Sequence, residues 1–321
     1  MPLTLLVIAN PSGPHGKLLE QLPNDIEFSL SNEPDRIRAQ APHADAILNT
    51  EFRGALLGTA LSVSTTVRWV HHLYTGVEGV LIPEVVASTV PLTNGRGVFR
   101  RPLGEWAIGA MLHFAYDLRR VVRQQEAGVW QTFFARCLHG STLGIVGYGG
   151  IGSTAAALAK PFGVKIAALR RRPELFANDP LVDTFYRPAQ LNELMAASDY
   201  LVLATPLTSE TRGMIGAEQI AAMKLNGVVI NVGRGPVIDE PALVAALEAG
   251  KIKGAALDVF EVEPLPAGHP FWGMQNVLLS PHSADRVENF FELAYEAFFE
   301  NLDRFRKGER LEYLVDKHAG Y

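Results

Sequence analysis

Short runs of aliphatic and β-branched residues recur along the whole chain and alternate with longer amphipathic stretches. Runs of this length that are bounded by Gly, Pro and Asn predict buried strands. In the N-terminal part, the predicted strands are Leu3–Ala9, Ile26–Leu30, Ala44–Leu48, Val67–Leu73 and Val90–Thr93. In the C-terminal part, they are Leu143–Gly147, Val164–Leu169, Tyr200–Thr205, Val228–Val232, Gly254–Val259 and Asn276–Ser280.

Helical periodicity fills several of the intervals between these strands. The longest example, Leu103–Gln125, contains no proline and predicts one long helix. Ala189–Ala197 and Glu240–Ala249 predict helices between later strands, and a last helical pattern covers Arg286–Lys307. Strands that alternate with helices predict an α/β fold, in which helices cover both faces of a parallel sheet.

A chain of 321 residues is long enough for about two domains of ~150 residues each. Only the second half opens with a nucleotide-binding fingerprint, so we expect the domain boundary near residue 98. The final helix could stay on the second domain or return to the first. The expected division is therefore residues 1–97 and 98–285, with residues 286–321 joining the first domain if that helix crosses back.

Composition excludes several classes of protein. Apolar residues make up 48% and charged residues 20%, as in ordinary globular proteins. Lys and Arg number 29 against 34 Asp and Glu, which disfavours binding to nucleic acid. No apolar run approaches the ~18 residues that span a bilayer, and the N-terminus has no basic region typical of a signal peptide. The single cysteine, Cys137, fits a reducing compartment. We expect a cytoplasmic protein without a membrane or nucleic-acid partner.

Metal binding is not expected either. With one cysteine, the chain has no cluster of residues at metal-ligand spacing. His71 and His72 are adjacent in a predicted strand, so their side chains should point to opposite faces of the sheet.

A glycine-rich loop directly follows the strand that begins at Leu143. Its pattern, Gly147-x-Gly149-x-x-Gly152, is weak evidence alone but strong between a strand and a helix. The first glycine permits a tight turn, the second lets the backbone approach a pyrophosphate, and the third allows close packing of helix on strand. The helix N-terminus would then offer amides to the phosphates. The predicted cofactor-binding residues of this loop are Gly147, Tyr148, Gly149, Gly150, Ile151 and Gly152.

The next strand, Val164–Leu169, favours NADP(H) over NAD(H). An NAD site usually places a carboxylate at the end of this strand, where it binds the ribose hydroxyls. This chain has Arg170, Arg171 and Arg172 there instead. Guanidinium groups suit a 2′-phosphate, so Arg170 and Arg171 are predicted cofactor residues, while NAD(H) remains possible.

Three ionisable residues, Arg234, Glu263 and His282, follow successive strands of the second domain. Open α/β sheets form their sites at such strand ends. Arg can bind a substrate carboxylate and polarise an adjacent carbonyl. His can supply a proton, and a nearby carboxylate can orient its ring and raise its pKa. Together they suggest hydride transfer to a carbonyl, although each could instead have an ordinary structural role.

Several stretches resemble the signature motifs of the D-isomer-specific 2-hydroxyacid dehydrogenases. They are Thr142–Gly152, Leu203–Leu207 with Thr211, Asn231–Gly235, Leu257–Pro266 and Leu279–Ala284. The resemblance covers roughly residues 67 to 284 in the family's order and spacing. The glyoxylate/hydroxypyruvate reductase branch is the most similar, because of the arginines after the second strand of the cofactor domain.

The resemblance implies a role for each matching position. Arg234 would bind the 2-oxo acid, His282 would donate the proton and Glu263 would pair with His282. Backbone amides of Thr75 and Gly76 would hold the substrate carboxylate, with Arg234 and His282 also contacting the substrate. The remaining cofactor contacts would come from Thr205, Pro206, Thr211, Val232, Gly233 and Asp258.

The resemblance also implies an assembly and an activity. We expect two Rossmann-like domains with the active site in the cleft between them, the last helix back on the first domain, and a homodimer formed through the cofactor domain, with Leu103–Trp130 in the interface. The expected activity is NADPH-preferring reduction of a small 2-oxo acid, glyoxylate or hydroxypyruvate, to the D-2-hydroxy acid. Alternatives are another dehydrogenase on this scaffold, such as formate dehydrogenase, or a non-enzymatic NAD(H)-sensing corepressor.

Overall fold

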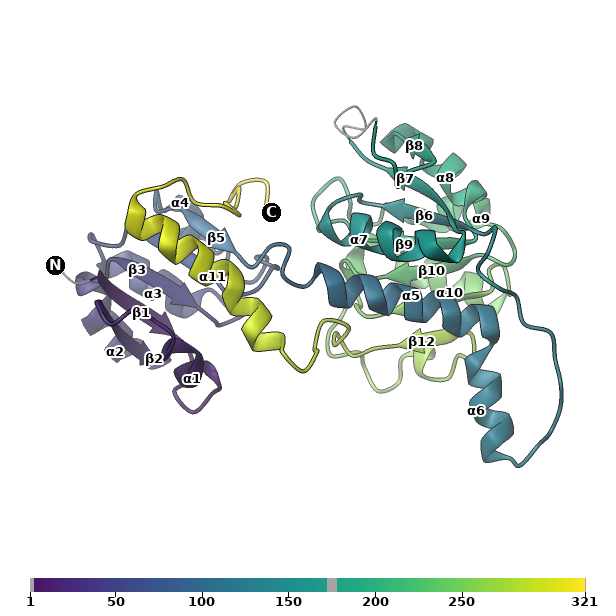
Figure 1. Cartoon of the computed structure of the whole chain (residues 1–321), viewed down its shortest axis with the longest axis horizontal. Coiled ribbons are helices and arrows are strands. Elements are labelled where there is room, and N and C mark those ends of the chain that lie inside the picture. Colours follow the sequence, from purple (N-terminus) through teal and green to yellow (C-terminus); the bar gives the residue numbers. More distant parts are fainter. Residues whose placement is uncertain (1–2, 172–177, 321) are drawn as a thin grey trace. The chain divides into compact units, whose positions relative to one another are not determined.

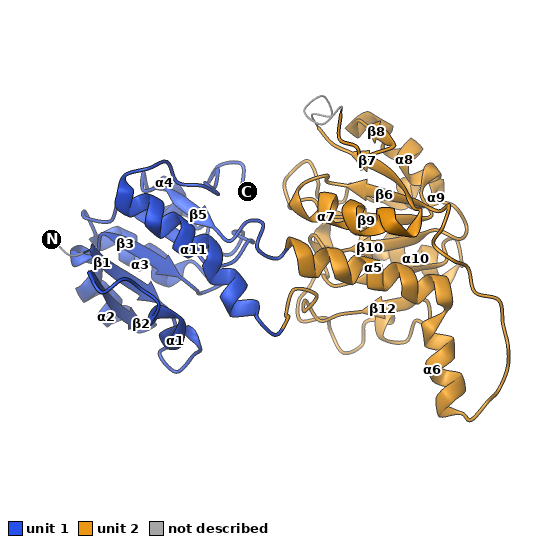
Figure 2. Ribbon diagram, viewed as in Figure 1, with its two compact units in different colours: residues 1–99, 288–321 blue, residues 100–287 orange. Residues whose placement is uncertain are grey.

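The computed structural model describes residues 3–171 and 178–320 of the chain. The chain divides into two compact units, and Figure 2 colours them separately. Unit 1 comprises residues 1–99 and 288–321, and unit 2 comprises residues 100–287. The boundaries expected from the sequence, after residues 97 and 285, lie two residues before these divisions.

Unit 1 is built around a five-stranded parallel sheet (Figure 1). Its strand order is β2-β1-β3-β4-β5. The strands are β1 (Leu3–Ile8), β2 (Ile26–Ser31), β3 (Ala46–Asn49), β4 (Trp69–His72) and β5 (Leu92–Asn94). The helices are α1 (His15–Leu19), α2 (Pro34–Gln40), η1 (Ala41–His43), α3 (Ala55–Val63), α4 (Pro83–Ala87) and α11 (Phe290–Lys307).

Helices cover both faces of this sheet. On one face, Ile37 of α2, Leu57 of α3 and Val85 of α4 join one apolar core with the strands. On the other face lies α11, whose Phe298 stacks on Trp69 of β4 with ring centroids 5.8 Å apart. The last helix therefore packs on unit 1, and it begins at Phe290 rather than at Arg286.

Unit 2 contains a seven-stranded parallel sheet in the order β12-β11-β10-β9-β6-β7-β8. Its strands are β6 (Thr142–Val146), β7 (Lys165–Leu169), β8 (Thr184–Tyr186), β9 (Tyr200–Leu203), β10 (Val228–Asn231), β11 (Gly254–Leu257) and β12 (Val277–Leu279). Its α-helices are α5 (Arg100–Tyr116), α6 (Leu118–Glu126), α7 (Gly150–Ala159), α8 (Leu191–Ala197), α9 (Ala217–Ala222) and α10 (Glu240–Glu248). Short 3₁₀ helices are η2 (Lys160–Phe162), η4 (Pro188–Gln190), η5 (Gly235–Val237) and η6 (Pro270–Trp272).

The topology of unit 2 determines where a site can form. One apolar core joins α5 and α7 to the sheet, and a second core joins α8, α9 and α10 to its other face. The strand order reverses between β6 and β9, which are hydrogen-bonded neighbours. Open α/β sheets bind ligands beyond the carboxyl ends of the strands at such a switch point. The predicted α/β class, with two parallel sheets covered by helices on both faces, is confirmed.

One predicted element is wrong. The single helix expected over Leu103–Gln125 is two helices, α5 and α6, which are separated at Asp117. Asp117 adopts the left-handed conformation, with φ of 48°. A left-handed residue cannot continue a right-handed helix, and Asp is among the residues that tolerate this conformation. The chain therefore changes direction there although the hydrophobic pattern is uninterrupted.

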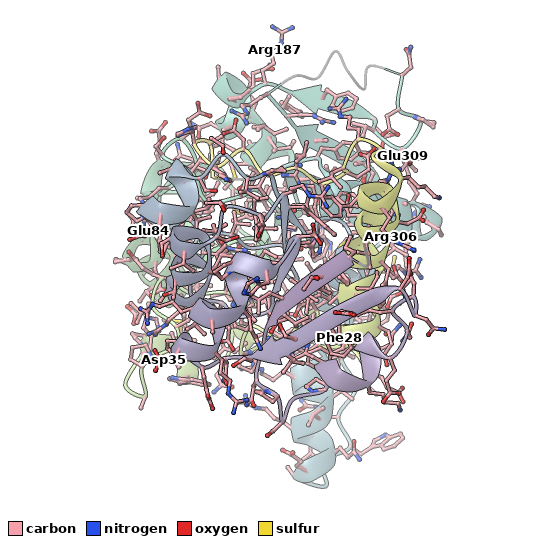
Figure 3. All side chains as sticks on the ribbon, turned by 90° about the vertical axis from the view of Figure 1, so that its left-hand side faces the viewer. Phe28, Asp35, Glu84, Arg187, Arg306 and Glu309 are labelled. Carbon is pink, nitrogen blue, oxygen red and sulfur yellow. The ribbon has the colours of Figure 1, made fainter. Side chains whose placement is uncertain are left out.

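Several charged side chains of both units are exposed. Figure 3 labels exposed examples: Asp35, Glu84, Arg187, Arg306 and Glu309. Within the described parts of the chain, no helix combines the length and the apolar character needed to cross a membrane.

Candidate active site

The glycine-rich loop connects β6 to α7 at the switch point of the unit 2 sheet. Gly147 has a φ of 95°, which only glycine adopts readily. A Cβ atom at Gly152 would lie 2.5 Å from the carbonyl oxygen of Gly147, so close packing requires glycine there as well. By contrast, a Cβ at Gly149 would meet no described atom within 4 Å. The loop is therefore tight at its first and third glycines and open at its second.

This arrangement fits a dinucleotide. The α7 helix starts at Gly150, followed by Ile151, so its first amides stand next to the open position at Gly149. Beyond the end of β9, the Thr205 Oγ1 is buried and makes no hydrogen bond to any described residue. A buried hydroxyl without a partner is costly, and a bound polar ligand would remove that cost. When bound, a nicotinamide dinucleotide would supply the hydride in a redox reaction.

Further predicted cofactor residues support the backbone of this site. The Val232 amide donates to the Leu203 carbonyl over 3.1 Å, and the Gly233 amide donates to Asn231 Oδ1 over 3.0 Å. Thr211 Oγ1 donates to the Pro206 carbonyl over 2.7 Å. The Thr211 hydroxyl is thus hydrogen-bonded to the backbone of the loop that follows β9, and it stabilises this loop.

Tyr148 and Arg171 have carboxylate neighbours that sequence reasoning missed. The Tyr148 side chain is buried, and its hydroxyl donates to Asp179 Oδ2 over 2.9 Å. Burial, together with the negative charge of Asp179, raises the pKa of Tyr148. Arg171 forms an exposed ion pair with Glu210, with N–O separation of 3.2 Å. Arg172 lies outside the described residues. No sequence pattern linked these pairs, because their members are far apart along the chain.

His282 and Glu263 form a hydrogen-bonded pair. Their Nδ1 and Oε2 atoms are 2.7 Å apart, and Glu263 Oε1 accepts from the Phe260 amide over 2.9 Å. Since the carboxylate faces Nδ1, the Nε2 atom of His282 is turned away from Glu263. His282 has a φ of 51°, an uncommon conformation for a residue with a side chain.

Asp258 holds this turn in place. Its carbonyl accepts the His282 amide over 2.9 Å, and its Oδ1 accepts the amides of Ser283 and Ala284 over 2.8 and 3.0 Å. Asp258 is only 2% exposed. The sequence analysis expected a cofactor contact from Asp258; what the structure shows is that this side chain fixes the backbone around His282.

The electrostatics of the pair suit proton transfer. The hydrogen bond to Glu263 raises the pKa of His282, against the opposing effect of burial. Burial alone would raise the pKa of Glu263, but hydrogen bonds from His282 and the Phe260 amide outweigh it, so the pKa lies below its usual range. The charge of Arg234 also acts on both groups, lowering both pKa values. The three residues follow β10, β11 and β12, which are neighbours in the sheet.

Asn231, at the end of β10, is a supporting residue that the sequence analysis did not single out. It is fully buried, and its side chain donates to the Arg234 carbonyl over 3.1 Å while accepting from Gly233. Arg234 Nη1 donates to the Gly233 carbonyl over 2.8 Å. Asn231 thus shapes the turn that carries Arg234, and its place in the Asn-Val-Gly-Arg motif was the available signal.

In unit 1, Thr75 and Gly76 follow the end of β4. Thr75 is exposed, and its Oγ1 donates to the Gly95 carbonyl over 2.9 Å. Among described residues, no acceptor is bonded to the backbone amides of Thr75 and Gly76. Two adjacent amides of this kind can bind an anion.

Comparisons with known proteins agree with these features. A family model for the NAD binding domain of D-isomer specific 2-hydroxyacid dehydrogenases matches residues 108–284. Glyoxylate reductase of Korarchaeum cryptofilum is 35% identical over 253 residues, which cover 76% of this chain and 74% of the relative.

Solved structures extend the similarity to the whole chain. A D-isomer specific 2-hydroxyacid dehydrogenase family protein of Aeromonas salmonicida has a TM-score of 0.86 at 29% identity, covering 99% of this chain and 100% of the other. NADPH-dependent glyoxylate/hydroxypyruvate reductase of Sinorhizobium meliloti, in complex with NADP and sulfate, has a TM-score of 0.84 at 26% identity, covering 99% and 100%. The family model, the sequence relatives and the solved structures agree with one another, and the chain belongs to the D-isomer-specific 2-hydroxyacid dehydrogenases, a family of oxidoreductases.

Proposed function

We propose that this protein reduces a small 2-oxo acid, glyoxylate or hydroxypyruvate, to the D-2-hydroxy acid, with NADPH as the preferred reductant. The observation that carries the proposal is the 2.7 Å pair of His282 and Glu263, next to the strand that bears Arg234. The names of the relatives, glyoxylate reductase and glyoxylate/hydroxypyruvate reductase, support this choice of substrate.

The roles of the residues follow from their chemistry. The Arg234 guanidinium binds the substrate carboxylate and polarises the neighbouring carbonyl oxygen. The amides of Thr75 and Gly76 bind the same carboxylate. Glu263 holds the imidazolium form of His282, whose Nε2 donates a proton to the carbonyl oxygen as the hydride arrives at the carbonyl carbon. Reduction therefore requires protonated His282, and oxidation of the hydroxy acid requires the neutral ring.

The activity is tested by mixing the protein with NADPH and glyoxylate, or with hydroxypyruvate, and following the loss of reduced cofactor by absorbance. We expect the wild-type protein to turn over the substrate. In the His282→Ala variant, kcat should be lower by roughly 10²–10⁴-fold. Tight NADPH binding without turnover of any 2-oxo acid would instead favour a non-enzymatic sensor.

The preference for NADPH rests on Arg170, which directly follows β7. Arg170→Asp should weaken the use of NADPH and spare or improve that of NADH, because a carboxylate repels the 2′-phosphate and accepts from a 2′-hydroxyl. One charge-assisted bond of roughly 1.5–3 kcal/mol corresponds to about a tenfold preference or more. The measurement is kcat/KM for both cofactors at fixed ionic strength. A wild type that prefers NADH would contradict the proposal.

We also propose a cytoplasmic homodimer that forms through unit 2. None of the residues of α6 is buried, and Leu118, Val121 and Val122 are among its exposed apolar side chains. After this helix, Trp130 is 97% exposed and Phe134 is fully exposed. Large apolar side chains that are exposed in one segment are typical of protein interfaces, and a second copy of the chain could cover them in a symmetric pair.

A further inference from the structure

The loop that carries Thr75 and Gly76 is held by buried side chains from neighbouring strands of unit 1. Asn94, the last residue of β5, donates through Nδ2 to the Thr75 carbonyl over 2.7 Å. His72, the last residue of β4, places Nε2 3.0 Å from the Gly76 carbonyl. The Tyr74 carbonyl accepts the Gly95 amide over 3.2 Å. Three consecutive carbonyl groups of the loop are therefore fixed by hydrogen bonds.

A chain of contacts determines which nitrogen of His72 carries the proton. Asn49 Nδ2 lies 2.9 Å from the Glu51 carbonyl and 3.0 Å from His72 Nδ1. Because a carbonyl only accepts, the Asn49 atom facing it must be the amide nitrogen. That nitrogen also donates to His72 Nδ1, so the proton of the neutral ring is on Nε2. His72 consequently donates to the Gly76 carbonyl.

Burial keeps His72 in this one form. The side chain of His72 is completely buried, and this burial lowers its pKa to about 4. At neutral pH the ring is uncharged, with one donor and one acceptor nitrogen. Asn49 and Asn94 are also buried, and the Oδ1 atom of each makes no hydrogen bond within the described residues. Each of these two carboxamides thus donates hydrogen bonds through its NH₂ group, while its oxygen stays without a partner within the described residues.

Fixing these carbonyls also fixes the amides of the loop. A peptide unit is planar, so the carbonyl of one residue sets the direction of the next residue's N–H. The bond from Asn94 to Thr75 therefore orients the Gly76 amide. The bond from His72 to the Gly76 carbonyl holds the next peptide plane, which carries the Val77 amide. Gly76, whose backbone would otherwise be the most flexible in the loop, is thus held on both sides.

We propose that His72 and Asn94 are positioning residues, with His72 oriented by Asn49, and that they aim the amides of the Thr75–Gly76 loop at the carboxylate of the 2-oxo acid. The proposal rests on the proposed function, which assigns these amides to the substrate. It explains why the fold keeps three buried polar side chains at the end of a hydrophobic sheet, two of them, Asn49 and Asn94, with an unsatisfied oxygen. The carboxylate would otherwise face a loop whose amides point in several directions.

The test compares variants of two adjacent histidines in the full-length protein. His72→Phe keeps an aromatic ring but loses both nitrogens, whereas His72→Gln retains an N–H near the Gly76 carbonyl. His71→Phe is the matched control, because His71 lies next in the same strand, packs against Phe298, and bonds Thr93 Oγ1 through Nδ1 over 2.8 Å. We expect His72→Phe to raise KM for glyoxylate about tenfold, as for one lost hydrogen bond in the complex. The kcat and the Kd for NADPH should remain within about twofold.

The other variants distinguish positioning from folding. His72→Gln should recover most of the lost affinity, and His71→Phe should leave KM near the wild-type value even if it lowers Tm. Asn94→Ala should raise KM in the same way as His72→Phe, and it carries the test if His72→Phe does not fold. An unchanged KM in the folded variants, or an equal rise in His71→Phe, would overturn the proposal.

A second measurement does not depend on turnover. Hydrogen exchange at the amides of Gly76 and Val77 should accelerate in His72→Phe or Asn94→Ala but not in His71→Phe. If the wild type reduced no 2-oxo acid, the proposed function would fail while accelerated exchange would still support the positioning of the loop. Unchanged exchange in the His72 and Asn94 variants would reject the positioning role itself.

Discussion

At the scale of single residues, Arg234 offers the most direct test of substrate binding. Lys keeps the charge of Arg but cannot form two parallel hydrogen bonds to a carboxylate. Arg234→Lys should therefore raise KM for the 2-oxo acid about tenfold or more, the effect of losing one charge-assisted bond. The Kd for NADPH, measured by fluorescence titration, should hardly change. A near-normal KM would remove Arg234 from the substrate site.

The pairing of Glu263 with His282 predicts a shift in the pH profile. Glu263 raises the pKa of His282, and reduction needs the protonated ring, so activity should fall as pH rises through that pKa. In Glu263→Gln the carboxylate is lost and the pKa of His282 drops. The alkaline limb of the kcat/KM profile for reduction should then move to lower pH. If the limb stays in place, Glu263 does not control the protonation of His282.

At the scale of elements, replacing two glycines of one loop by alanine should affect different properties: stability at Gly152 and affinity for the cofactor at Gly149. In Gly152→Ala the new methyl group would press against the Gly147 carbonyl, so the variant should lose roughly 1–3 kcal/mol of stability. In Gly149→Ala the methyl group meets open space and Tm should hardly change, but the group occupies the side where the backbone must approach a pyrophosphate. Its Kd for NADPH should rise about tenfold or more.

Thermal unfolding and cofactor titration of both variants check this pair. Gly152→Ala should show the lower Tm, while Gly149→Ala should show weak binding at a normal Tm. Equal losses of stability in the two variants would mean that the second glycine is needed for folding rather than for the cofactor.

Hydrophobic patterning predicted the elements that have long apolar runs and missed those that do not. Every strand expected from the sequence is present, whereas β8, which has three residues and no buried one, gave no signal. The break at Asp117 was missed because it depends on a single backbone conformation. At the candidate site, the strand ends indicated Arg234, Glu263 and His282; the structure joins His282 and Glu263 by a hydrogen bond, and the catalytic roles of all three stay predictions. The bonds from His72 and Asn94 could not be predicted, because they depend on how separate strands align.

At the scale of the whole molecule, the apolar surface after α6 predicts the oligomeric state. The double variant Trp130→Ser/Phe134→Ser should be a monomer, whereas the wild type should have twice the chain mass in light scattering. Leu225→Ser is the control, because Leu225 is 74% exposed in a different loop of unit 2. A wild type that is monomeric at micromolar concentration would contradict the proposed dimer.

Unit 1 is built from two segments of the sequence, one before unit 2 and one after it. This order has a consequence for synthesis on the ribosome. The strand β4, which carries Trp69 and His71, emerges first, but α11, which covers these two side chains, is made only after the whole of unit 2. Val315, whose amide donates to the Leu92 carbonyl over 2.8 Å, arrives later still. At ~5–20 residues per second, the wait is roughly ten to forty seconds. Unit 2 can thus finish folding first, while the aromatic face of the nascent N-terminal sheet stays without its covering helix throughout this wait.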